Sequence, residues 1–410
     1  AGAGLAVVSR PDEAMRKAGP LLVVDDALNA LEQMGRSARA RVEGKVVAVT
    51  GSVGKTTTKD ALKVALSACG PTHAAVSSFN NHWGVPLTLA RMPRASAFAV
   101  IEVGMNHAGE IETLIDMVRP HVAIITAIAE SHIGHFDSLA GIADAKAEIF
   151  TGVVPGGVAV INRDSEFFDH LAAKARGCGI TDIRSFGEAE GADIRLIRCT
   201  LHDTCSCMTA KVRGEEVTCK LGAPGRHVVQ NALAVLGACQ AAGADLARCA
   251  LALADIRPPS GRGVRHKLSK DGVSLTLIDE SYNANPASMR AALQMLATAE
   301  PAGRGRRVAV LGDMLELGVH SRGLHAGLAE PVVQAGVDKV FACGPEMTWL
   351  WKELPGDMHG ACTATSQELI EPLLGSIQSG DVIMVKGSLG SKMGLVVKAI
   401  TDRFGGNTGG

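Results

Sequence analysis

A glycine-rich loop between an apolar strand and a helix most limits how this chain can fold. The apolar run 46–50 leads into the loop, and a helical pattern over 56–67 follows it. The loop consists of Thr50, Gly51, Ser52, Val53, Gly54, Lys55, Thr56 and Thr57. Glycines let backbone N–H groups approach phosphate oxygens, and the helix adds the positive end of its dipole. Although Val49 replaces the first glycine of the full Walker pattern, the loop predicts a nucleoside triphosphate site in an α/β domain.

Polar residues near this loop are candidates for holding a metal ion. We expect Lys55 to lie along the β- and γ-phosphates and the Thr56 hydroxyl to ligate Mg²⁺. Glu102 lies near the end of the apolar run 97–103, and His132 follows the next strand. Open α/β sheets bind ligands at the carboxyl ends of their strands, which favours both residues as metal ligands. The alternatives are a capping or ion-paired Glu102 and a solvated His132.

Lys146 lies on a predicted helix, 14 residues after His132. An ordinary ammonium there would be repelled by Mg²⁺ and would more often be a surface charge. The residue joins a metal site only if CO₂ converts its amine to a carbamate, which inverts its charge. The residues alone leave both possibilities open.

Alternating strands and helices along the rest of the chain predict an α/β fold with parallel sheets. The segment 190–222 alternates like antiparallel strands, and the sequence Arg257-Pro258-Pro259 opens a linker that ends near Gly263. A second α/β series follows this linker. The predicted strands are 46–50, 97–103, 122–128, 274–279, 308–312, 339–343 and 382–386, and the main predicted helices are 56–67, 110–119, 139–150 and 226–242.

Composition excludes several classes of protein. Lys and Arg total 41 against 42 Asp and Glu, a net charge of −1 that gives no support to nucleic-acid binding. No apolar stretch approaches the roughly 18 residues of a membrane span, and the N-terminus lacks the features of a secretory signal. With the absence of a heptad pattern, the near-neutral charge favours a monomer.

Ten scattered cysteines indicate a reduced, cytoplasmic protein rather than a disulfide scaffold. Cys199, His202, Cys205 and Cys207 are spaced closely enough to raise the question of a zinc site. No paired C-x-x-C elements support a closed site, so idle or buried thiols are the favoured interpretation.

Eight segments together resemble the Mur ligases of peptidoglycan synthesis. They are TGSVGKTTTKD, SSFNNHWGVPLTL, IEVGMNHAGEI, AKAEIF, GRHVVQNALA, DESYNANPASM, LGDMLELG and VKGS, and the resemblance runs from about residue 3 to residue 400. SYNANP and NNHWGVP resemble the branch of the family that joins D-alanyl-D-alanine to UDP-N-acetylmuramoyl-tripeptide. The P-loop alone would not separate this family from other NTPases.

The resemblance implies a fold and a domain plan. Residues 1–43 would be a remnant of an N-terminal UDP-substrate domain, and residues 44–257 a central P-loop ATPase domain with a parallel sheet. Residues 258–403 would form a C-terminal Rossmann-like α/β domain, and residues 404–410 a frayed tail. Closure of the C-terminal domain about the Pro258-Pro259 linker is also expected.

The resemblance further implies ATP and two Mg²⁺ ions as cofactors, and roles for individual residues. Thr56 and Glu102 would hold one Mg²⁺, and His132 with a carbamylated Lys146 would help to hold the second. Asn81 would lie near the metal and phosphates, and Asn231 would reach the adenine with His227 beside it. Arg262 and Asp279 would close onto ATP. The nucleotide side of the cleft would be lined by Tyr282, Asn283 and Asn285.

The sequence departs from the usual family pattern at Trp83, Ala147, Glu280 and Leu389.

Two other functions remain as alternatives. One is a sister Mur ligase that adds a different amino acid, and the other is a P-loop NTPase without ligase activity, including a catalytically weak fragment.

Overall fold

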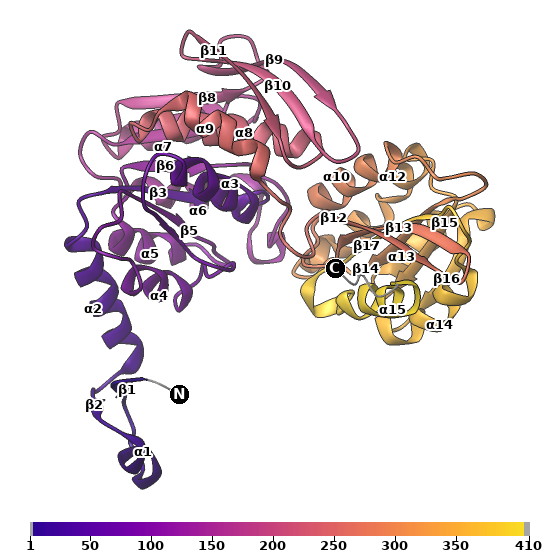
Figure 1. Ribbon diagram of the computed structural model, residues 1–410, viewed down its shortest axis with the longest axis horizontal. Coiled ribbons are helices and arrows are strands. Elements are labelled where there is room, and N and C mark those ends of the chain that lie inside the picture. The colour runs from indigo at the N-terminus through magenta and orange to yellow at the C-terminus, as the bar shows by residue number, and fades with distance from the viewer. Residues whose placement is uncertain (1–2, 406–410) are drawn as a thin grey trace.

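The computed structural model describes residues 3–405 and contains two large β-sheets and one small one (Figure 1). The large sheets have nine and six strands. We call the nine-stranded sheet with its helices the first unit, and the six-stranded sheet with its helices the second unit. The segment between Asp255 and Val264 connects them.

The first unit has the strand order β11-β10-β9-β8-β7-β6-β3-β5-β4. All neighbouring strands between β4 at one edge of the sheet and β9 pair in parallel. At the other edge, β10 pairs antiparallel with both β9 and β11. The strands are β3 (Lys45–Thr50), β4 (Thr72–Ala74), β5 (Phe98–Glu102), β6 (Val122–Ile125), β7 (Val158–Asn162), β8 (Asp182–Gly187), β9 (Ile194–Leu201), β10 (Ser206–Val212) and β11 (Glu215–Leu221).

Helices cover both faces of this sheet because its parallel strands are apolar on both sides. On β3, Val47 and Val49 face one helical layer, while Val46 and Ala48 face the other. The first layer contains α3 (Lys55–Ser67), α8 (Arg226–Ala241) and α9 (Leu246–Ala252). The second contains α4 (Gly84–Ala90), α5 (Glu110–Val118), α6 (Leu139–Ala147) and α7 (Phe168–Gly177).

The second unit has the strand order β12-β13-β17-β14-β15-β16, in which only the β12–β13 pair is antiparallel. Helices again cover both faces. The strands are β12 (Val264–Lys270), β13 (Val273–Glu280), β14 (Arg307–Gly312), β15 (Lys339–Cys343), β16 (His359–Thr363) and β17 (Val382–Lys386). The helices are α10 (Pro286–Ala297), α11 (Ser321–Ala326), α12 (Ala329–Gln334) and α13 (Met347–Glu353) on one face, and α14 (Ser366–Ser376) and α15 (Gly394–Phe404) on the other.

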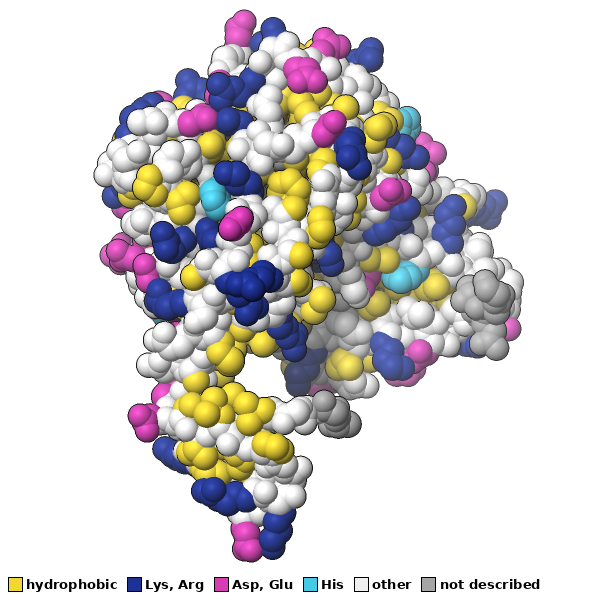
Figure 2. Space-filling view, turned by 60° about the vertical axis from the view of Figure 1, so that its left-hand side comes forward, with side chains coloured by type: hydrophobic (Ala, Val, Ile, Leu, Met, Phe, Trp, Pro, Cys, Tyr) yellow, Lys and Arg dark blue, Asp and Glu magenta, His cyan; other side chains and the backbone are white. Residues whose placement is uncertain are grey.

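The N-terminal segment forms an arm that projects from the first unit (Figure 1). It contains β1 (Ala6–Val8), α1 (Glu13–Ala18), β2 (Leu21–Val23) and α2 (Ala27–Ala40), and β1 pairs in parallel with β2. The C-terminal end of α2 is fixed to the first unit, because Arg39 donates hydrogen bonds to the carbonyls of Val118 and Arg119 at 2.8 and 2.7 Å. Hydrophobic side chains gather on the arm's surface (Figure 2), among them the exposed Leu5, Met15, Leu22, Val23 and Met34.

Several predicted boundaries differ from the structure. The strand expected over 122–128 ends at Ile125, since the chain turns there to meet the glycine-rich loop. The helix expected to continue through Phe150 changes to a 3₁₀ turn at Glu148. Phe404, placed in the frayed tail by the sequence, ends α15 and is buried against the six-stranded sheet. The rest of that predicted tail, 406–410, lies outside the described residues.

None of the helices within residues 3–405 combines the length and apolar character needed to cross a membrane.

We expect the stability of the first unit to depend strongly on Leu233, a residue of α8 whose surface is 0% exposed. Leu233→Ala removes apolar contacts and leaves a cavity, so it should lower the free energy of unfolding by about 2–5 kcal/mol. Leu251→Ala on α9 is the control, because Leu251 is 75% exposed, and its effect should stay within about 0.5 kcal/mol. Calorimetric unfolding measures both. Equal effects would contradict the packing described here.

Candidate active site

A cavity lies between the two units, with walls from both. It contains about 1350 Å³ of empty space and opens to solvent. Most of the residues that the sequence selected line it: Ser52, Val53, Gly54, Lys55, Thr56, Thr57, Glu102, His132, His227, Asn231, Arg262, Tyr282, Asn283 and Asn285. Gly51, Asn81, Lys146 and Asp279 do not.

The glycine-rich loop depends on close approaches that only glycine permits. Gly54 precedes α3 with a φ of 84°, and a Cβ there would lie 2.7 Å from Oδ1 of Asn231. A Cβ on Gly51 would lie 1.9 Å from Oγ1 of Thr126. The Thr126 hydroxyl donates to the Val53 carbonyl at 2.5 Å, and the Ser52 hydroxyl donates to the Ala129 carbonyl at 2.9 Å. The loop is therefore held against the chain that follows β6.

Lys55 is the first residue of α3, and its side chain folds back over the loop. Its Nζ donates a hydrogen bond to the Gly51 carbonyl at 2.6 Å. Burial lowers the pKa of Lys55 to about 8, an effect that the Glu102 carboxylate opposes and the Arg262 guanidinium reinforces. An anion in the cavity would favour the charged form of Lys55 and would compete with the Gly51 carbonyl for its ammonium.

Glu102 ends β5 and is buried, with 1% of its surface exposed. Its Oε1 accepts hydrogen bonds from Oγ1 of Thr56 at 3.0 Å and from Nδ2 of Asn80 at 2.7 Å. Its Oε2 is buried and has no hydrogen-bond partner among the described residues. A buried carboxylate oxygen without a partner is unfavourable unless a cation satisfies it. The pair of Thr56 and Glu102 therefore fits a bound Mg²⁺ that takes its remaining ligands from phosphate and water.

His132 and Lys146 lie on the same side of the first unit as Lys55. Burial is the main cause that lowers the pKa of His132, and the charges of Lys55 and Lys146 lower it further, while Glu316 raises it. Lys146 is 1% exposed, and burial together with Lys55 holds its pKa well below the ordinary value, against the opposing charge of Glu148. A lowered pKa favours the neutral form of this amine, which is the form that reacts with CO₂.

The linker and the second unit supply the opposite wall. The Arg262 guanidinium stacks over the Tyr282 ring at 4.4 Å from its centre. Nζ of Lys386, at the end of β17, contacts Oε2 of Glu280 at 3.1 Å and the Asn283 carbonyl at 3.0 Å. This wall therefore brings two cations to a cavity whose other side carries the glycine-rich loop.

Comparison with known proteins assigns the chain to a family. The model of the Mur ligase middle domain matches residues 49–239, and that of the Mur ligase, glutamate ligase domain matches residues 265–389. A UDP-N-acetylmuramoyl-tripeptide–D-alanyl-D-alanine ligase of Escherichia coli is 34% identical over 404 residues, which cover 98% of this chain and 86% of that protein. The chain belongs to the Mur ligase family.

Solved structures agree with this membership. A MurF of Acinetobacter baumannii superimposes with a TM-score of 0.85 at 32% identity, covering 97% of this chain and 84% of that one. A MurF ligase of Thermotoga maritima, solved in complex with ADP, has a TM-score of 0.81 at 22% identity. It covers 97% of this chain and 94% of its own, and this second likeness concerns the fold alone.

Two residues selected on the Mur ligase resemblance lie one position away from the side chains that reach the site. Asn81 is exposed, and its Oδ1 accepts from the backbone N–H groups of Trp83 and Gly84 at the start of α4. Asn80, not Asn81, contacts Glu102. Asp279, like Asn81, does not line the cavity and bonds locally instead. Its Oδ1 accepts hydrogen bonds from the backbone N–H and the hydroxyl of Ser281, at 3.1 and 2.6 Å.

Alternation along β13 explains the second shift, because neighbouring strand residues point to opposite faces. Glu280 therefore lines the cavity in place of Asp279. Sequence reasoning also missed Ser78, whose hydroxyl lies 3.0 Å from that of Thr56. The signal for Asn80 and Ser78 was present in SSFNN, but nothing in the sequence showed which polar side chain turns inward.

The cysteine-rich segment forms no metal cluster. Cys199 lies on β9, and Cys207 on β10, where Cys207 pairs with Thr200. No group of three or more His, Cys, Asp or Glu side chains in residues 3–405 is arranged to hold a metal ion by itself.

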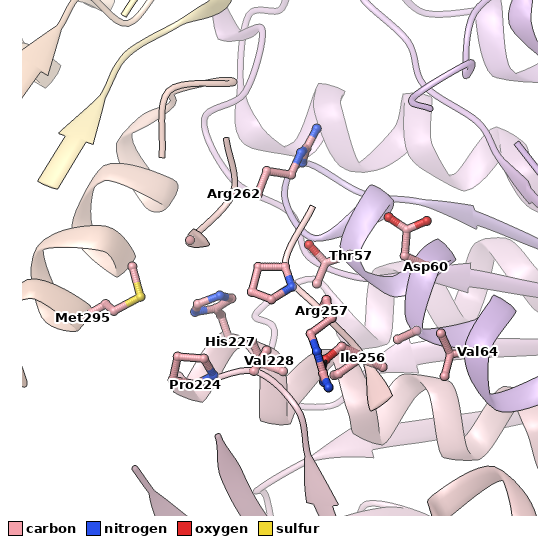
Figure 3. A pocket seen from close by; sticks show the side chains of 14 residues that line it. Thr57, Asp60, Val64, Pro224, His227, Val228, Ile256, Arg257, Arg262 and Met295 are labelled. Atoms are coloured by element: carbon pink, nitrogen blue, oxygen red, sulfur yellow. Dashed lines mark hydrogen bonds between the residues drawn. The ribbon is translucent and has the colours of Figure 1, made fainter. Parts of the chain in front are cut away.

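A smaller recess of about 530 Å³ adjoins the main cavity beside the interdomain linker (Figure 3). Thr57, His227 and Arg262 line both spaces. Figure 3 shows the side chains of Thr57 and Asp60 on α3, with Arg257 and Arg262 from the linker segment. Arg262 and Thr57 therefore lie where the linker, the phosphate loop and the second unit meet.

Gly54→Ala should abolish ATP binding by this Mur ligase. The loop needs a left-handed backbone at residue 54, which alanine adopts only with strain. The added Cβ would also clash with Asn231, so the loop must change shape. Gly177→Ala on α7 is the control, since nothing lies within 4 Å of its added Cβ. Calorimetric titration with ATP and Mg²⁺ measures the affinity of each variant. Unchanged affinity in Gly54→Ala would refute this account of the loop.

Proposed function

We propose that this chain is an ATP-dependent ligase that joins D-alanyl-D-alanine to UDP-N-acetylmuramoyl-tripeptide. The observation that carries the proposal is the buried Thr56–Glu102 pair at the phosphate loop, in a cavity that Arg262 also lines. One oxygen of this carboxylate has no hydrogen-bond partner within the described part of the chain. The named function of the Escherichia coli relative supports the choice of substrates.

In the first step of the proposed reaction, the carboxylate of the tripeptide attacks the γ-phosphate of ATP, giving an acyl phosphate and ADP. Two anions must meet, so charge neutralisation and alignment dominate the barrier. Lys55 and Arg262 line the cavity and would serve that purpose. Lys55 would exchange its bond to the Gly51 carbonyl for the phosphate oxygens.

In the second step, the amine of D-alanyl-D-alanine attacks the acyl carbonyl, and phosphate leaves from a tetrahedral intermediate. The bond that forms is an amide, and the bond that breaks is the acyl C–O bond to phosphate. Nucleotide and acceptor must therefore share one water-restricted space. The cavity that both units line would provide this space once closure of the units excludes water.

Several side chains of this chain would hold ATP and Mg²⁺. Thr56 and Glu102 would hold one Mg²⁺, and His132 with carbamylated Lys146 would hold a second. When bound, Mg²⁺ neutralises phosphate charge and polarises the reacting oxygens. Asn231 and His227 would contact the adenine, and Tyr282, Asn283 and Asn285 would line the nucleotide side.

A cytoplasmic, monomeric protein is also part of the proposal. It rests on the ten scattered cysteines, the net charge of −1 and the absence of a heptad pattern in the sequence.

Phosphate release with each substrate omitted in turn tests the proposed ligation. We expect release only when ATP, UDP-N-acetylmuramoyl-tripeptide and D-alanyl-D-alanine are all present. Lys55→Ala should lower kcat by about 10²–10³-fold, the scale of losing one transition-state charge contact. Lys63→Ala on the same helix, α3, should retain kcat.

Stimulation by a different amino acid would instead favour a sister ligase, and release independent of both substrates would favour a simple NTPase. Near-normal ligation by Lys55→Ala would contradict the role given to that residue.

Lys146→Ala tests the carbamate. Its amine is buried with a lowered pKa, so the neutral form that reacts with CO₂ is present at lower pH than for an ordinary lysine. We expect the variant to be inactive and partly rescued by small carboxylic acids, which would replace the carbamate oxygens. The exposed Lys174→Ala should be active and indifferent to these acids. Full activity of Lys146→Ala without added acid would exclude the carbamate.

A further inference from the structure

Two loops from different units meet at the edge of the cavity. The first follows β6 and includes His132 and the turn η1 (Ile133–His135), and the second follows β14 and includes Glu316 and the turn η4 (Gly318–His320). The Glu316 carboxylate contacts Nδ1 of His132. A backbone hydrogen bond joins the same loops, from the N–H of Gly134 to the Glu316 carbonyl at 3.0 Å. His132 lines the cavity, whereas Glu316 is not among the lining residues and contacts His132 from outside the cavity wall.

Both members of this contact have an unfavourable backbone. His132 has a φ of 61° and Glu316 a φ of 62°, values that few residues with a side chain adopt. They are two of the six non-glycine residues with positive φ among residues 3–405. Such conformations persist only where the surroundings determine them, and they concentrate at functional sites. Here the two strained residues contact each other across the boundary between the units.

Two glycines allow the loops to approach this closely. A Cβ on Gly134 would lie 2.7 Å from the backbone nitrogen of Gly318, and a Cβ on Gly318 would lie 2.9 Å from Cα of Gly134. The loops therefore pack backbone against backbone beside the His132–Glu316 pair. The backbone packing holds the two loops together beside the pair, although the Glu316 side chain is 45% exposed.

The chemistry of the pair fixes the state of the imidazole. An ionised carboxylate only accepts hydrogen bonds, so Nδ1 of His132 must carry the proton. In the neutral ring, Nε2 then keeps the lone pair that a metal ion needs. Histidine ligands commonly donate their other N–H to a carboxylate, which fixes both tautomer and ring orientation. Here that carboxylate comes from the other unit.

We propose that Glu316 is a positioning residue that prepares His132 to ligate a metal ion only while the second unit is docked on the first. This inference rests on the proposed function, in which His132 helps to hold Mg²⁺. Docking would then complete the metal site, so that the chain reaches full activity only with the two units together.

The first test reads the imidazole itself, in metal-free protein. In histidine-labelled protein, ¹H–¹⁵N NMR spectra identify the tautomer of His132, whose signals are assigned by their loss in His132→Asn. We expect the Nδ1–H form in the wild type and its loss in Glu316→Ala. Glu316→Gln, whose side-chain carbonyl still accepts a hydrogen bond, should restore it. An unchanged tautomer in Glu316→Ala would overturn the proposal whether or not the chain is a ligase.

The second test separates positioning from docking. Arg290 and Glu130 form another contact between the units, 3.4 Å long and partly exposed, so Arg290→Ala is the matched control. We expect Glu316→Ala to raise the Mg²⁺ concentration needed for half-maximal ligation, or to lower kcat, by about 10–100-fold. Arg290→Ala should change either quantity less than about twofold.

Hydrogen exchange at the Gly134 amide completes this test, because that amide bonds to the Glu316 backbone rather than to its side chain. Exchange should stay near the wild-type rate in Glu316→Ala. Equal losses in both variants, or fast exchange at Gly134 in Glu316→Ala, would show that Glu316 only docks the units and would overturn the proposal. If wild-type protein fails to ligate, the proposed function fails, and the NMR measurement still decides the role of Glu316.

Discussion

The arrangement of the site depends on one buried carboxylate, that of Glu102 at the end of β5. Its position follows from the parallel pairing of β5 with β3, because β3 leads into the phosphate loop and the carboxyl ends of both strands meet at one edge. Thr56 and Asn80 share one oxygen of the carboxylate, and the other oxygen has no hydrogen-bond partner in residues 3–405. A fold that buries a charge in this way is stable only when a cation or a proton compensates for it. A cation bound beside Glu102 would therefore be favourable.

Two lysines, Lys55 and Lys146, lie in the same unit as this carboxylate. Lys55 and Lys146 are each held at a lowered pKa, chiefly by burial and in part by other cations. Burial and neighbouring cations disfavour the charged forms of both amines, and a bound triphosphate would favour the charged form of Lys55. Under the proposed function, these side chains would receive an anionic nucleotide together with Mg²⁺.

Much of the fold and part of the site follow from the sequence. The phosphate loop could be recognised because its chemistry requires Gly51 and Gly54 at fixed positions, between a strand and a helix. The apolar strands β3, β5, β15 and β17 were visible because both faces of a parallel sheet are buried. Short elements such as β4 and α4 were missed, since their few residues carry no clear period.

The remaining site residues depend on side-chain direction, which composition does not encode. Asn80 and Asn81 are chemically identical, and only the turn into α4 decides which amide reaches Glu102. Asp279 and Glu280 differ by one position on a strand, so they face opposite ways. Glu316 was not selected at all, because its partner His132 lies 184 residues away in the chain and only the docking of the two units brings them together.

Calorimetric titration of Glu102→Gln with ATP, with and without Mg²⁺, tests the central claim most directly. The substitution removes the charge and keeps the side-chain shape, with Glu112→Gln on the exposed side of α5 as the control. The account predicts Mg²⁺-dependent ATP binding in the wild type and in Glu112→Gln, and loss of the Mg²⁺ dependence in Glu102→Gln. Wild-type affinity and Mg²⁺ dependence in Glu102→Gln would contradict it.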